Sequence, residues 1–84
     1  NNSGNNSGRE VVICGRNSCP FCMKMYAFLD KNNINYRTVE SNSSEGQDLM
    51  SKTGATGVPL CLILMNGQIL KHKVGYHEDL SFFA

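Results

Sequence analysis

The stretch Arg16-Asn17-Ser18-Cys19-Pro20-Phe21-Cys22 places two cysteines three positions apart, where a helix is predicted to begin. Pro20 suits the first helical turn, because its missing N–H costs no hydrogen bond there. Apolar residues then recur at spacings of three and four, which forms one apolar face: Cys22, Met25, Tyr26, Phe28 and Leu29. The sequence therefore predicts a helix from Pro20 to about Asn32, with the cysteine pair in its first turn.

This cysteine arrangement suits the reduction of disulfides. The reaction needs a thiolate that attacks and a second thiol close enough to release the mixed disulfide. Cys19 lies at the N-terminus of the predicted helix, where free backbone N–H groups and the positive end of the helix dipole lower a cysteine pKa. Arg16 adds positive charge, and no acidic residue lies between Glu10 and Asp30. We expect Cys19 to attack and Cys22 to resolve.

Two strands and a second helix are predicted around this first helix. Val11 to Cys14 is a short apolar run of β-branched type, typical of a buried strand. Ile34 to Glu40 alternates apolar and polar residues, which also indicates a strand. The pattern from Ser43 to Gly54 predicts a short helix, with Leu49 and Met50 facing inward.

The end of the chain predicts a hairpin and a last helix. Leu60 to Met65 is the most apolar run, and Asn66-Gly67 after it is a strong hairpin signal, since a type I′ turn needs positive φ at both positions. Gln68 to Val74 is the predicted return strand, and His77 to Phe83 a short final helix. The predicted order is β-α-β-α-β-β-α, an α/β fold.

The cysteine stretch resembles the glutaredoxin family of the thioredoxin fold, whose members share C-P-(Y/F)-C after a basic residue three positions upstream. The resemblance covers nearly everything from Arg9 onward and includes Ile34-Asn35-Tyr36 after the helix. It implies a four-stranded mixed sheet flanked by three helices, and an enzyme that reduces protein or glutathione mixed disulfides. It further implies that glutathione is the co-substrate and that disulfide-containing proteins are partners. We expect no bound cofactor or metal.

A second motif, Thr56-Gly57-Val58-Pro59, resembles the family's loop in which a cis-proline faces the dithiol. By that resemblance, Pro59 is cis and the Val58 backbone pairs with the cysteine of the bound peptide or glutathione. The resemblance thus implies a set of residues that bind substrate beside the catalytic cysteines: Arg16, Phe21, Gly57, Val58 and Pro59.

The back half departs from the glutaredoxin pattern. Gly57 stands where the family has threonine, and Gly75-Tyr76 stands where it has the Gly-Gly that leaves space for the γ-glutamyl end of glutathione. Sixteen positions separate Pro59 from Gly75, more than in the usual glutaredoxin hairpin, and this hairpin is more similar to that of thioredoxin. The electron donor therefore stays open between glutathione and a flavoprotein thioredoxin reductase.

Two classes of non-enzyme also stay open. A C-x-x-C pair occurs in zinc sites, but structural zinc takes four ligands, usually as two close pairs. The remaining candidates form no second C-x-x-C or H-x-x-x-H: Cys14, Cys61, His72 and His77. An iron–sulfur module is the other metal alternative, and an interaction or sensor module without turnover is the second class. Cys14 and Cys61 lie in strand-like runs and are predicted to be small buried hydrophobes.

Length and charge narrow the class of protein further. The 84 residues leave room for one small domain, and a formal net charge of +1 gives no reason to expect a nucleic-acid partner. No apolar run approaches the ~18 residues that a membrane span needs. We expect a cytoplasmic monomer. Residues 1–8 repeat Asn-Asn-Ser-Gly, which predicts a disordered linker or remnant ahead of a folded domain at 9–84.

Overall fold

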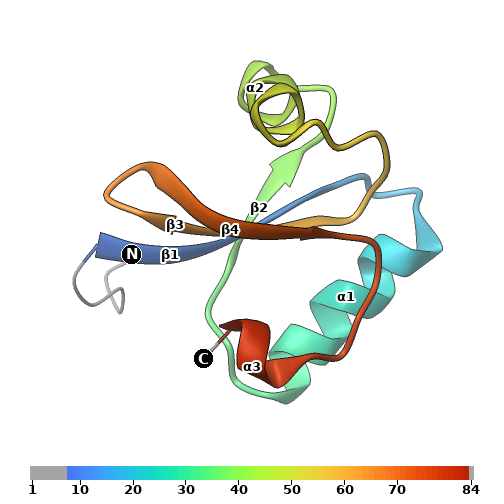
Figure 1. Ribbon diagram of the computed structural model, residues 1–84. Helices are drawn as coiled ribbons and strands as arrows, with labels where there is room; N and C mark the ends of the chain where they lie inside the picture. Colours follow the sequence, from blue (N-terminus) through green and yellow to red (C-terminus); the bar gives the residue numbers. More distant parts are fainter. Residues whose placement is uncertain (1–7, 84) are drawn as a thin grey trace.

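The computed structural model describes residues 8–83, in which three helices flank a four-stranded sheet (Figure 1). The elements in chain order are β1 (Arg9–Gly15), α1 (Pro20–Lys31), β2 (Arg37–Glu40), α2 (Ser44–Thr53), β3 (Leu60–Met65), β4 (Gln68–Val74) and α3 (Leu80–Phe83). The strand order is β2-β1-β3-β4, with β1 parallel to β2 and every other pair antiparallel. This is the predicted thioredoxin fold with its mixed sheet.

The sheet separates two hydrophobic clusters, because successive residues of a strand point to opposite faces. α2 covers one face, and α1 and α3 cover the other (Figure 1). The α1 side of the core contains Val11, Ile13, Met25, Leu29, Cys61, Ile63, Phe82 and Phe83. The α2 side contains Val12, Cys14, Val39, Leu49, Leu60, Leu62 and Leu64. Cys61 therefore lies on the α1 side of the sheet and Cys14 on the α2 side. Both are fully buried, as predicted from the strand-like runs that contain them.

The second strand is shorter than the sequence predicts, since β2 begins at Arg37 and not at Ile34. The chain leaves α1 through Asn33, whose φ of 58° turns it in the left-handed region. Ile34 and Tyr36 then pack against the α1 side of the core, where the rings of Tyr36 and Tyr26 stack at 5.9 Å. The alternation before Arg37 thus reflects core contacts of a connecting segment and not a strand.

The last helix is also shorter than predicted and begins at Leu80 instead of His77. Asp79 caps it, because its Oδ1 accepts hydrogen bonds from the backbone N–H of Ser81 at 3.1 Å and from the Ser81 hydroxyl. The N–H of Asp79 in turn donates to Nδ1 of His77 at 3.3 Å. The imidazole lies between helix and sheet, stacked on Phe83 with centroids 5.4 Å apart.

The predicted hairpin turn is confirmed, with φ of 53° at Asn66 and 85° at Gly67. The predicted linker at residues 1–8 lies almost entirely outside the described part of the chain. Its last residue, Gly8, is described, and its carbonyl accepts the backbone N–H of Asn66 at 3.1 Å. Among the helices at 8–83, none is long and apolar enough to cross a membrane.

Candidate active site

The two sequence motifs lie at the same end of the sheet, where β1 ends and β3 begins. β1 and β3 run antiparallel, and Cys14 at the end of β1 pairs with Leu60 at the start of β3. Pro59, just before Leu60, therefore lies at the end of the sheet where β1 is followed by the loop that contains Cys19. Gly75, which follows β4, lies at the same end of the sheet, since its N–H donates to the Pro59 carbonyl at 2.8 Å. The loop at 57–59 and the start of α1 thus both lie at this end of the sheet.

Cys19 occupies the N-cap of α1, and its sulfur accepts the backbone N–H of Cys22 at 3.4 Å. The Cys22 thiol is the main cause that lowers the pKa of Cys19, followed by the Cys22 backbone N–H. Slight desolvation opposes this shift, whereas the backbone of Phe21 and the charge of Arg16 add to it. The sulfur is partly exposed. Cys19 is therefore the thiol of the pair that ionises first and can meet a substrate.

Cys22 differs from Cys19 in its burial and in the direction of its pKa shift. It is fully buried one turn into the helix, and burial is the main cause that raises its pKa to about 11. The backbone N–H of Arg16 contacts its sulfur at 3.5 Å and opposes that shift. Near neutral pH, Cys22 thus stays protonated, whereas the pKa of Cys19 is shifted downward, so that the two thiols differ in acidity although they are three residues apart.

Gly15 and Tyr26 enclose Cys22, and sequence reasoning assigned neither of them to the site. A Cβ on Gly15 would lie 2.7 Å from the Cys22 sulfur and 2.9 Å from the Tyr26 hydroxyl oxygen, both too close. Burial, then the charge of Cys22, raises the pKa of Tyr26 to about 12. The only sequence signal for either residue is the glycine that directly follows the apolar run from Val11 to Cys14.

Arg16 lies against the end of β2. Its Nε donates to the hydroxyl of Ser41 at 3.1 Å, and Ser41 is buried with its N–H bonded to the Gly15 carbonyl at 2.9 Å. This contact holds the exposed side chain at the edge of the site. Ser41 is a third residue that sequence reasoning missed, because it carries no motif.

The other residues predicted to bind substrate differ in exposure. The Phe21 ring is 56% exposed, with the ammonium of Lys24 at 5.6 Å from its centroid. The Val58–Pro59 peptide bond is cis, as the resemblance implied, and Pro59 is fully buried. Gly57 and Val58 are half-buried. The site therefore combines a solvent-facing aromatic ring with a loop whose proline is anchored in the core.

The remaining cysteines are thiols of the core. Burial is the main cause that raises the pKa of Cys61 to about 12, and it also raises the pKa of Cys14. In residues 8–83, which hold all the cysteines, none forms a disulfide. No three side chains of His, Cys, Asp and Glu in this part of the chain lie close enough together to hold a metal ion.

Comparison with known proteins gives one family and one fold. The family model described as Glutaredoxin matches residues 11–69. Thioredoxin f from spinach chloroplast is 18% identical with a TM-score of 0.69, over 90% of this chain and 71% of that one. A thioredoxin from Nicotiana alata is 21% identical with a TM-score of 0.65, over 90% and 69%. The oxidised thioredoxin from Plasmodium falciparum is 16% identical with a TM-score of 0.67, over 98% and 86%. A comparison with curated protein sequences finds no match.

Proposed function

This chain belongs to the glutaredoxin family of thiol-disulfide oxidoreductases, and on that premise we propose that it reduces protein or glutathione mixed disulfides through Cys19 and Cys22. The observation that carries the proposal is the opposite state of the two sulfurs. The pKa of Cys19 is lowered at the helix N-cap, and burial raises that of Cys22 to about 11. A nucleophile and a protonated resolving thiol are therefore held one helical turn apart.

The proposed reaction has two displacement steps. The Cys19 thiolate attacks one sulfur of the substrate disulfide, forms a mixed disulfide and releases the first substrate thiol. Cys22 then loses its proton and attacks the Cys19 sulfur, which releases the second substrate thiol and leaves a Cys19–Cys22 disulfide. The substrate is reduced by two electrons and the enzyme is oxidised by two. Two glutathione molecules restore the dithiol and leave as oxidised glutathione.

The residues proposed to contact the substrate lie at the same end of the sheet. The Phe21 ring offers an exposed apolar surface beside Cys19, and the Arg16 guanidinium offers positive charge to a carboxylate of glutathione. The backbone of Val58, in the loop formed by Gly57, Val58 and Pro59, pairs with the substrate cysteine. What supports these roles is shared position: the loop and the cysteines meet where β1 ends and β3 begins.

A reducing compartment suits this chemistry, and we propose that the protein acts in the cytoplasm as a monomer. Two core thiols, Cys14 and Cys61, are fully buried and unpaired among the described residues, as is usual where glutathione keeps thiols reduced.

Tyr76 favours a second candidate for the electron donor. It stands where the family pattern has the second glycine, and its hydroxyl donates to the carboxylate of Glu78. An aromatic ring at that position leaves less room for the γ-glutamyl end of glutathione, which favours a flavoprotein thioredoxin reductase as donor instead.

Recycling assays distinguish the two donors. Disulfide reduction is followed with glutathione, glutathione reductase and NADPH, and separately with thioredoxin reductase and NADPH. We expect turnover with the glutathione system. Rapid turnover with thioredoxin reductase alone would reject glutathione as donor, and failure of the reduced protein to reduce any disulfide would reject the proposed function.

A further inference from the structure

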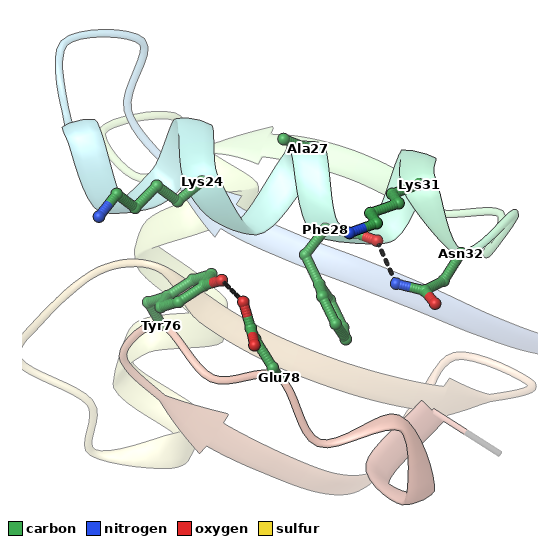
Figure 2. A pocket seen from close by; sticks show the side chains of 7 residues that line it. All are labelled: Lys24, Ala27, Phe28, Lys31, Asn32, Tyr76 and Glu78. Atoms are coloured by element: carbon green, nitrogen blue, oxygen red, sulfur yellow. Dashed lines mark hydrogen bonds between the residues drawn. The ribbon is translucent and has the colours of Figure 1, made fainter.

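A groove runs along α1 on the side that faces the segment after β4 (Figure 2). Its volume is about 570 Å³, and its walls include Lys24, Phe28 and Lys31 from the helix and Tyr76 and Glu78 from the segment. Figure 2 shows Phe28 projecting from the helix toward Glu78, with the Tyr76 ring beneath Lys24. We call this hollow the α1 groove.

The α1 groove carries positive charge at both ends. Neither Lys24 nor Lys31 forms an ion pair with any residue in the described range. The Lys24 ammonium lies over the Phe21 ring, which leaves its charge available to a partner. Glu78 is the one carboxylate in the wall, and it accepts the hydroxyl of Tyr76. Two lysines against one carboxylate make the groove cationic.

The middle of the α1 groove is apolar and aromatic. Phe28 and Tyr76 are half-buried and pack against the α1 side of the core, so their exposed parts form the floor. Cationic ends around an aromatic floor complement an extended segment with acidic residues on either side of an apolar one. A basic segment would meet both lysines and would be repelled.

The α1 groove lies along the helix that Cys19 caps. Lys24 and Lys31 follow Cys19 by five and twelve positions, which at 1.5 Å per helical residue is about 8 Å and about 18 Å along the axis. An extended peptide advances about 3.3 Å per residue. A segment laid along α1 thus brings its residues about two and about six positions from the disulfide cysteine to the two lysines, and both side chains share one face because their separation is even.

We propose that the α1 groove docks an acidic segment of the protein disulfide substrate while Cys19 attacks that substrate's cysteine. The proposal rests on the proposed function and specifies its substrate class: proteins with acidic residues about two and six positions from the reactive cysteine. Docking adds affinity at a site outside the dithiol, and its electrostatic part weakens as salt rises.

Peptide disulfides test the docking directly. Peptides with one cysteine, linked as a mixed disulfide to 2-mercaptoethanol, carry Glu, Gln or Lys at two and six positions from that cysteine, on its N-terminal or its C-terminal side. The reduced protein receives each peptide in single turnover, and quenched samples give the rate at which both thiols appear. The protein dithiol supplies the two electrons and becomes the Cys19–Cys22 disulfide.

The readout is the ratio of the rates for the Glu and Gln peptides in one protein sample, which does not depend on the folded fraction. In one of the two orientations we expect about threefold to tenfold preference for Glu at low salt, the range of a few exposed ion pairs, and less at high salt. Lys31→Glu should abolish the preference. The matched control Lys52→Glu changes an exposed lysine of α2, on the other side of the sheet, and should keep it.

The contrary outcomes are distinct. Equal rates for all peptides, a preference for Lys, or a Glu preference that survives Lys31→Glu would overturn the docking proposal and leave disulfide reduction standing. If no peptide is reduced, the proposed function fails and the docking proposal fails with it.

Discussion

The backbone N–H of Cys22 points at the sulfur of Cys19 across 3.4 Å, so that the buried cysteine donates to the sulfur that we propose as the nucleophile. Both of its donor groups, the thiol and the backbone N–H, lower the pKa of Cys19. The two cysteines are therefore one electrostatic unit. A change at Cys22 is expected to alter the reactivity of Cys19 as well as the second chemical step.

The first prediction concerns the thiolate of Cys19. Because hydrogen bonds from Cys22 lower its pKa from the usual cysteine value, alkylation by iodoacetamide should remain fast as the pH falls to 6. A cysteine in an unfolded peptide of the same local sequence should react at least about tenfold more slowly at that pH. Mass spectrometry of the alkylated peptide identifies the cysteine. Equal rates would contradict the activated thiolate, and Cys19→Ser should abolish disulfide reduction.

The second prediction concerns the resolving step. Cys22→Ser removes the thiol that attacks the mixed disulfide, so a covalent adduct between Cys19 and the substrate should accumulate. Intact-mass measurement under non-reducing conditions detects it. Cys22→Ala, which removes the thiol donor to the Cys19 sulfur without supplying a hydroxyl in its place, should also slow alkylation of Cys19 at pH 6. If glutathione is the donor, some monothiol turnover should persist, and an absence of any adduct would exclude Cys22 as the resolving thiol.

The third prediction concerns the glycine behind Cys22. Gly15→Ala puts a Cβ 2.7 Å from the Cys22 sulfur and should lower the free energy of unfolding by about 1–3 kcal/mol. Urea unfolding measures this difference. Gly57→Ala is the matched control, since its Cβ would lie 3.7 Å from Val74 in ordinary contact and should cost far less. Equal costs for the two variants would show that Gly15 is not tightly enclosed.

The fourth prediction separates two roles of Arg16. Its charge contributes least of the causes that lower the pKa of Cys19, so Arg16→Gln should leave the alkylation rate nearly unchanged. If the guanidinium binds a carboxylate of glutathione, the KM for glutathione should rise by about threefold to tenfold while kcat stays similar. Ser41→Ala, which removes the partner of Arg16 Nε, is expected to have a smaller effect in the same direction. An unchanged KM in Arg16→Gln would reject this binding role.

The fifth prediction concerns pH and His77. Burial, and then the charge of Lys73, lowers the pKa of this imidazole, while Asp79 opposes the shift. The unfolded chain therefore binds the proton more readily, so stability present above pH 6.5 is lost as the pH falls below it, down to the folded pKa. The buried Nε2 has no hydrogen-bond partner among the described residues, and Nδ1 already accepts the Asp79 N–H, so only the charge of Asp79 favours the protonated ring.

Urea unfolding at pH 7 and pH 5 checks this effect. His77→Phe keeps an aromatic ring against Phe82 and Phe83 and removes the titration, so it should lose less stability between the two pH values than the wild type. His72→Gln, at an exposed histidine of β4, should behave like the wild type. A wild-type loss matched by His77→Phe would assign the pH dependence to other groups.

The sequence by itself determined the features that depend on neighbours along the chain. The spacing of apolar residues after Pro20 identified α1, and Asn66-Gly67 identified the hairpin, because helix periodicity and turn geometry are local properties. The same locality placed Cys19 at the helix mouth. Local alternation misled at Ile34 and Tyr36, where contacts with the core, and not strand pairing, select the apolar residues.

Only the tertiary structure decided how the two cysteines differ. Burial of Cys22 against Gly15 and Tyr26 comes from packing α1 on the end of β1, and no motif reports that depth. The same packing brings Ser41 to Arg16, residues 25 positions apart. A pKa depends on desolvation and on donors within a few ångströms, and these are set by which segments meet in space.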